Sequence, residues 1–193
     1  MTFEISYSVS ALYVHPRGPY PQLVADWYDE KRDARNYQGT HPVVAHPPCG
    51  PWGRYAHKCK QDRGAALHAI DTVFEYGGVL EHPVTSQIWK LMTLTEKLPS
   101  DCMLVDLCQY QWGHRAIKPT RLLVCCKSPH QSIIEQILSC PPFPDAVRPK
   151  GGRHTSELEK MSKIQRCLTP PLLAHTLVRV ASLCGASSAI KEV

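Results

Sequence analysis

The chain has 193 residues, a formal net charge of +5 and 43% hydrophobic residues, which fits one globular domain with a sizeable core. No apolar run approaches the roughly 20 residues needed to cross a bilayer, and the N-terminus lacks the basic and apolar regions of a signal peptide. The nine cysteines therefore predict free thiols in a reducing, cytoplasmic compartment, not a disulfide framework. The mild positive charge permits an anionic partner such as nucleic acid without requiring one.

Four short apolar runs predict buried strands, at residues 11–14, 42–46, 77–82 and 121–126. Between the second and third runs, apolar residues recur at helical spacing and stop at Gly77. Strand, helix and strand in this order predict a βαβ unit, which implies parallel strands. We therefore expect an α/β fold with a mostly parallel central sheet and flanking helices.

The rest of the chain predicts one domain with a single long loop. Residues 127–155 are rich in Pro, Ser, Gly and basic residues, which predicts an exposed loop or small insertion. Residues 169–184 begin with prolines and carry an apolar face, which predicts a closing helix. We expect one catalytic-type domain over residues 1–180, followed by a helix end and tail over 181–193.

Two reactive side chains follow neighbouring strands of the predicted sheet. Cys49 lies in "HPPC", directly after the second apolar run, and Glu81 lies in "EHP", at the end of the third. In open α/β sheets, functional groups gather at the carboxyl ends of the strands, and consecutive strands are often neighbours. A thiol beside a carboxyl group suits nucleophilic attack assisted by an acid.

These segments, with "QYQWGHRAIKPTRLLV" at residues 109–124, resemble in order the motifs of the DNA cytosine-5 methyltransferases, especially phage-borne relatives. The resemblance implies a methyltransferase-like (Rossmann-like) fold acting on a flipped-out cytosine. It implies Cys49 as the nucleophile that attacks C6 of the base and Glu81 as a protonated acid at N3. The substrate-binding side chains that it implies or allows are Trp52, His82, Arg115, Lys118 and Arg121.

The cofactor segment departs from the family pattern. Residues 11–21, "ALYVHPRGPYP", stand where the family has Phe-x-Gly-x-Gly, and they keep one glycine, Gly18. The acidic residue expected after the second strand is Asp26 or Asp29. The resemblance implies S-adenosylmethionine bound by Gly18 and Asp26. Because the glycine turn is degraded, another modification of a pyrimidine, in DNA or as a nucleotide, fits the same segments equally well.

Other interpretations of Cys49 remain open. It can be a small core thiol, or a zinc ligand with His46, His57 and Cys59, whose spacing is H-x2-C-x7-H-x-C. The signatures of zinc deaminases and of phosphate-binding Walker loops are absent. We predict an enzyme that modifies a pyrimidine base, in DNA or as a nucleotide, in the cytoplasm (the host's, if phage-encoded) and away from membranes. The alternatives are a non-catalytic nucleic-acid-binding protein on the same fold and a small zinc-stabilised module.

Overall fold

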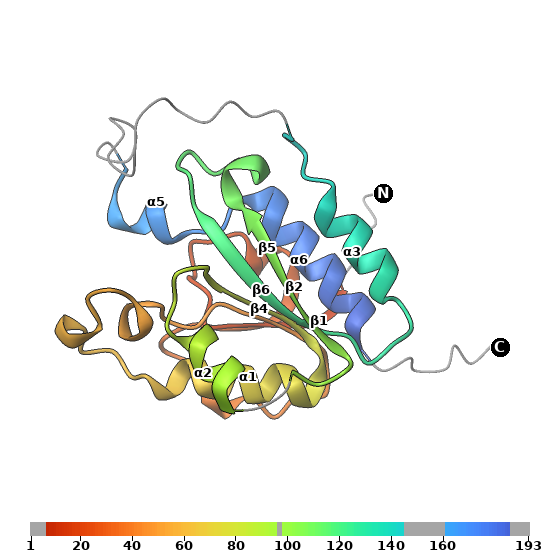
Figure 1. Cartoon of the computed structure of the whole chain (residues 1–193), viewed down its shortest axis with the longest axis horizontal. Coiled ribbons are helices and arrows are strands. Elements are labelled where there is room, and N and C mark those ends of the chain that lie inside the picture. Colours follow the sequence, from red (N-terminus) through yellow and green to blue (C-terminus); the bar gives the residue numbers. More distant parts are fainter. Residues whose placement is uncertain (1–6, 96–97, 145–160, 186–193) are drawn as a thin grey trace.

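Six strands form one mixed sheet in the order β2-β1-β3-β4-β6-β5 (Figure 1). The computed structural model describes residues 7–95, 98–144 and 161–185. Strands β1 to β4 pair in parallel, whereas β6 is antiparallel to both β4 and β5. The strands are β1 (Tyr7–Leu12), β2 (Val24–Tyr28), β3 (Val43–Ala45), β4 (Gly78–Pro83), β5 (Cys102–Cys108) and β6 (Pro119–Cys125).

The prediction of a mostly parallel, methyltransferase-like (Rossmann-like) sheet is therefore wrong. Continuous apolar runs show that a strand is buried on both faces, but they do not show its direction. The ten residues between β5 and β6 reverse the chain beside β5, and β6 then enters the sheet between β4 and β5. The outcome is an α/β fold with a mixed sheet.

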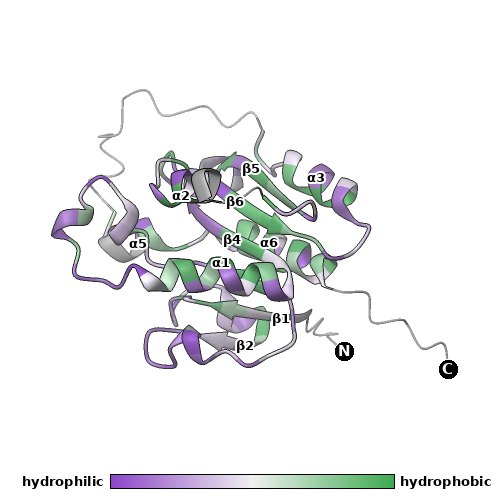
Figure 2. Cartoon of the chain, turned by 60° about the horizontal axis from the view of Figure 1, so that its bottom comes forward, coloured by the Kyte–Doolittle hydropathy of each residue, from purple (hydrophilic) through white to green (hydrophobic). Residues whose placement is uncertain are grey.

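Helices cover both faces of this sheet. On one face lie α3 (Gln131–Ser139) and α6 (Pro171–Cys184), and on the other lie α1 (Gly64–Tyr76) and α2 (Ile88–Thr95) (Figure 1). A shorter helix, α5 (Lys163–Cys167), precedes α6. In Figure 2 the strands carry long hydrophobic stretches interrupted by polar residues, and α1 and α3 carry both colours, as expected for helices with one face in solvent.

The predicted βαβ unit is confirmed as β3, α1 and β4, and it depends on two glycines. Gly77 ends α1 and Gly78 begins β4, both with positive φ. A Cβ on Gly78 would lie 2.0 Å from the carbonyl oxygen of Val43, so only glycine allows β4 to approach β3 so closely. This approach places the ends of β3 and β4 side by side.

Single-turn 3-10 helices occupy several of the loops. They are η1 (Tyr20–Gln22), η2 (Ala34–Asn36), η3 (Gly50–Trp52), η4 (Ala56–Lys58) and η5 (Gln109–Trp112). All five belong to loops at the carboxyl edge of the parallel strands or to the β5–β6 connection. Two residues of the candidate site, Tyr20 and Gln109, lie in η1 and η5.

The structure refines one further prediction and corrects another. The segment 127–155, predicted as a loop or small insertion, contains helix α3, whose Ile134 and Leu138 are buried; its part from residue 145 lies outside the described residues. Cys102 and Cys125 form a disulfide across β5 and β6, so the cysteines are not all free thiols. The closing helix is confirmed as α6, while residues 186–193 of the predicted tail are not described.

The segment Gln165–Cys184 is long and apolar enough to cross a membrane by length and composition, but half of it is buried inside the protein. Helix α6 packs its fully buried Leu173, Ala174 and Leu177 against the sheet. A core helix meets the same test of length and composition, so this segment is weak support for a membrane span.

Candidate functional site

The parallel pairing of β3 and β4 brings "HPPC" and "EHP" to one edge of the sheet. Ala45 pairs with Leu80, so the next residues along the two strands, His46 and Glu81, are neighbours. Cys49 follows three residues later as the N-terminal flank of η3. The predicted proximity of the Cys49 and Glu81 segments is thus present in the structure.

Glu81 is the centre of a buried network of hydrogen bonds. Its Oε2 lies 3.0 Å from His46 Nδ1, and its Oε1 accepts hydrogen bonds from Gln109 Nε2 at 3.0 Å and Thr120 Oγ1 at 3.1 Å. Gln109 Nε2 also donates to Thr120 Oγ1 at 2.9 Å. The four side chains come from β4, η5, β6 and the residue that follows β3, so the network joins both halves of the mixed sheet.

These donors keep Glu81 ionised although it is buried. Burial by itself raises the pKa of Glu81, but the hydrogen bond and charge of His46, together with the charge of Lys118, outweigh it and bring the pKa to about 2. The resemblance implied a protonated Glu81. In the structure Glu81 is instead a hydrogen-bond acceptor at neutral pH.

The network continues from His46 to Tyr20. The Tyr20 hydroxyl lies 2.6 Å from His46 Nε2, and it donates to a neutral ring or accepts from a protonated one. Burial and the charge of Glu81 raise the pKa of Tyr20, which is therefore a neutral phenol. His46 is held at both ring nitrogens, and its orientation is fixed.

Cys49 combines access to solvent with a partly desolvated thiol. Cys49 is exposed. The surrounding protein nevertheless desolvates its thiol in part and raises the pKa of the thiol. The charge of Glu81 raises the pKa of Cys49 further, whereas the charge of Lys118 lowers it. The pKa of the Cys49 thiol therefore depends on the charges of both Glu81 and Lys118. Cys167, the last residue of α5, also raises the pKa of Cys49, so α5 borders this edge.

Two of the predicted substrate-binding residues lie on the opposite face of the sheet. His82 follows Glu81 in β4, so its side chain points toward the α1 and α2 face, where it packs edge-on against Trp89. Burial lowers the pKa of His82. Arg121 pairs with His82 across the strands and forms a bidentate ion pair with Asp106, at 2.6 and 2.8 Å. Neither faces Glu81.

Of the other predicted substrate-binding residues, Trp52 is buried and Arg115 is exposed. Trp52 is 4% exposed, and the guanidinium of Arg63 lies 4.2 Å from the centre of its ring, so Trp52 supports η3 from within the core. Its Nε1 is buried without a hydrogen-bond partner in the part of the chain that the structure describes. Arg115 is exposed, three residues before the half-buried Lys118.

The residues predicted to bind S-adenosylmethionine have other partners. Asp26 accepts hydrogen bonds from Ser10 at 3.0 Å and from Arg32 at 2.7 Å, and Gly18 closes a tight turn with the carbonyl of His15. The hydrogen-bonding capacity of Asp26 is thus partly used by Ser10 and Arg32. We therefore assign no step of the chemistry to S-adenosylmethionine.

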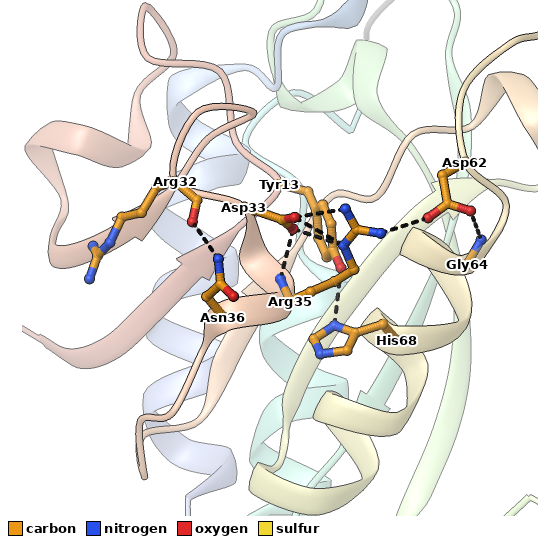
Figure 3. A network of polar contacts seen from close by, with 8 residues as sticks. All are labelled: Tyr13, Arg32, Asp33, Arg35, Asn36, Asp62, Gly64 and His68. Carbon is orange, nitrogen blue, oxygen red and sulfur yellow. Dashed lines mark hydrogen bonds and ion pairs between the residues drawn. The ribbon is translucent and has the colours of Figure 1, made fainter.

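The adjacent loops at the ends of β1 and β2 are filled by a second polar cluster (Figure 3). Arg35 binds Asp33 at 2.7 Å and Asp62 at 3.0 Å, and the Tyr13 hydroxyl lies 3.0 Å from His68 Nδ1. Tyr13 and Asp33 both have positive φ, a conformation that costs free energy in residues other than glycine. We call these five residues the Arg35 cluster.

The alternative zinc ligands are not brought together. His46 is bound by Glu81 and Tyr20, whereas His57 is an exposed residue of η4 and Cys59 follows it. Within residues 7–95, 98–144 and 161–185, no three His, Cys, Asp or Glu side chains are arranged to hold a metal ion.

The partners of Glu81 are not predictable from the sequence. Gln109 and Thr120 lie within the quoted segment 109–124, but no spacing rule links them to a carboxylate 28 and 39 residues away. Tyr20 carried no signal at all, and His46 was interpreted only as a possible metal ligand. Comparisons with protein-family models, curated proteins and solved structures found no match to this chain, so the site's chemistry rests on its own geometry.

Proposed function

We propose that the protein modifies a pyrimidine base through a covalent adduct between Cys49 and ring atom C6. The observation that carries the proposal is the interaction of an exposed thiol with a buried carboxylate and an ammonium group at one edge of the sheet. Attack would form the bond between Sγ and C6, break the C5=C6 π bond and move its electron pair onto C5 and the conjugated group at C4, which makes C5 nucleophilic.

The three side chains would have separate roles. Cys49 would supply the nucleophile once its proton is lost to solvent, since the thiolate and not the thiol attacks. The Lys118 ammonium would stabilise both the thiolate and the negative charge that develops on the ring. Glu81 would hold the ring edge opposite C6 through a hydrogen bond. The base must be unpaired or flipped out of a duplex to reach them.

Covalent trapping tests this proposal. The protein is incubated with single-stranded DNA that contains 5-fluorodeoxyuridine or 5-fluorodeoxycytidine, and with the corresponding nucleotides, and intact mass is measured. We expect an adduct of one protein and one base in the wild type. The matched control is Cys140→Ala, which removes another exposed thiol and should keep the adduct. Cys49→Ala should lose it. An adduct that survives in Cys49→Ala would contradict the mechanism.

A second function is favoured by one observation, the raised pKa of Cys49, because a thiol kept protonated is a weak nucleophile. On this alternative the protein binds nucleic acid without modifying it. The loop that contains η3 and η4 exposes Arg54, Lys58 and Lys60 beside Tyr55, which is 63% exposed. Cationic and aromatic side chains together suit unpaired strands. Salt-dependent DNA binding that is unchanged in Cys49→Ala, without any adduct, would favour this alternative.

A further inference from the structure

The hydrogen bonds of Glu81 leave one acceptor position open. Each carboxylate oxygen can accept about two hydrogen bonds. Oε1 already accepts from Gln109 and Thr120, whereas among the residues that the structure describes, His46 is the one donor to Oε2. The side chains of His46 and Glu81 are 12% and 9% exposed, so a small part of this pair remains accessible. The hydrogen-bonding capacity of Oε2 therefore leaves room for one further donor.

The same network has no donor to spare. Both amide hydrogens of Gln109 are used, one on Glu81 and one on Thr120, and the Thr120 hydroxyl hydrogen points to Glu81. A flipped Gln109 amide would bring its oxygen against the carboxylate, so the orientation is fixed. Gln109 Oε1 is buried and accepts no hydrogen bond from any residue that the structure describes. The network thus has unfilled acceptors, and its donors already have partners.

Pyrimidines differ at the ring atom that such a network would meet. C6 and N3 lie opposite each other in the six-membered ring, so a base with C6 at Cys49 turns N3 away from the thiol. Uracil and thymine carry a hydrogen on N3 and can donate it to Glu81. Neutral cytosine presents a lone pair at N3, which a carboxylate repels and which no unused donor of this network can satisfy.

Lys118 also favours uracil over cytosine. An ammonium group has donors only, and it lies close enough to influence both Cys49 and Glu81. Addition of a thiolate to C6 of uracil moves charge onto O4, an acceptor that an ammonium stabilises. In cytosine the group at C4 is an amine, which is itself a donor.

We infer that the site takes a uracil-type base, with a hydrogen on N3, in preference to cytosine. This inference rests on the proposed function, and it names the substrate class of that same site. The minimal step needs no further reactant. Sγ bonds to C6, the thiol proton leaves to solvent, the electron pair moves onto O4, and C5 takes a proton from solvent. Reversal removes a hydrogen from C5 and expels Sγ.

Exchange of the C5 hydrogen for deuterium measures this step without any methyl donor. Two matched single-stranded oligonucleotides with one deoxyuridine or one deoxycytidine, and the two monophosphates, are incubated with the protein in heavy water. Each exchange rate is divided by the rate with a simple thiol under the same conditions. This removes the intrinsic difference in reactivity between the two bases. At about pH 7 we expect a preference for uracil of about tenfold or more, the value of one hydrogen bond to a charged group.

Two changes should reduce that preference. Lowering the pH toward about 5 adds a proton to N3 of cytosine and lets it donate to Glu81, which stays ionised because its pKa is about 2. Glu81→Gln replaces an acceptor by a side chain that also donates, so it should narrow or reverse the ratio. The wild-type pH series decides the question even if Glu81→Gln does not fold.

The outcomes separate this inference from the proposed function. Exchange that needs Cys49 but is equal on both bases, or faster on cytosine, would overturn the uracil preference and leave the covalent mechanism standing. Exchange with neither base, in DNA or as nucleotides, would overturn the covalent mechanism itself and the substrate class with it.

Discussion

The network around Glu81 and the Arg35 cluster both join loops at the carboxyl edge of the parallel strands, but only the first is buried. Arg35, Asp33 and Asp62 have side chains that are 54%, 36% and 56% exposed. Glu81 has one that is 9% exposed, and Gln109 and Thr120 are fully buried. The hydrogen-bond lengths in the two clusters are similar.

The difference between the clusters lies in what replaces a lost partner. Water can hydrate an exposed carboxylate when an arginine is removed, so exposed ion pairs contribute little to stability. A buried carboxylate has no such replacement, so each missing donor leaves an uncompensated charge. We therefore expect substitutions around Glu81 to be costly and those in the Arg35 cluster to be mild. Four predictions test that expectation, in order of decreasing effect.

The largest effect is expected for Gln109→Leu. This change removes a donor from Glu81 and another from Thr120 inside the core, and we expect it to lower the free energy of unfolding by about 3 kcal/mol. Urea denaturation measures it. Gln111→Leu is the matched control in the same 3-10 helix, since Gln111 donates to a carbonyl in an exposed contact. Equal costs for the two variants would contradict the role given to burial.

Acid should destabilise the protein through Glu81. Its pKa of about 2 in the folded state lies below the value of 4.5 for an unperturbed glutamate. The stabilisation is therefore complete above about pH 4.5 and is lost as the pH falls through about 2, for a total of about 3 kcal/mol. His82 and His114, whose pKa values burial lowers, add a loss that begins below about pH 6.5.

Denaturation at a series of pH values checks this prediction. Glu81→Gln should be less stable than the wild type at neutral pH and should lose less stability between about pH 4.5 and 2. A wild-type protein whose stability is constant across that range would show that Glu81 is not held in its ionised form by the network.

A smaller effect is expected for Tyr20→Phe. The change removes one hydrogen bond to His46 Nε2 and keeps the packing of the ring, so we expect a loss of about 1 kcal/mol. Tyr55→Phe is the control, because Tyr55 is exposed and should show no change. A neutral Tyr20→Phe would mean that His46 is oriented by Glu81 alone.

The smallest effect is expected for Arg35→Ala in the exposed cluster (Figure 3). The two ion pairs of Arg35 are open to solvent and are screened by salt. The midpoint of urea denaturation should stay close to that of the wild type and should be identical to it at high salt. A loss as large as that of Gln109→Leu would remove the distinction between the two clusters.

The elements with strong local signals were predictable from the sequence. The spacing of apolar residues in α1, the stop at Gly77 and the strands on either side gave the βαβ unit. Because parallel strands joined by one helix bring their carboxyl ends together, the sequence also predicted that Cys49 and Glu81 would be neighbours.

The remaining features depend on contacts between distant segments. The direction of β6 follows from its connection to β5, and no residue in its apolar run encodes it. The disulfide between Cys102 and Cys125 depends on that same antiparallel register. The ionised state of Glu81 depends on donors from η5 and β6. Strand β5 was not predicted, and Asp106 interrupts its apolar run. Helix α3 was not predicted because it lies in a segment whose Pro, Ser, Gly and basic residues favour a loop.

A crystal structure of the protein with single-stranded DNA containing 5-fluorodeoxyuridine tests the central claim most directly. The account predicts continuous density between Cys49 Sγ and ring atom C6, with N3 of the base within hydrogen-bonding distance of Glu81 Oε2. A base bound elsewhere, for example on the exposed loop of η3 and η4, with Cys49 unmodified, would contradict the covalent mechanism and favour a binding function.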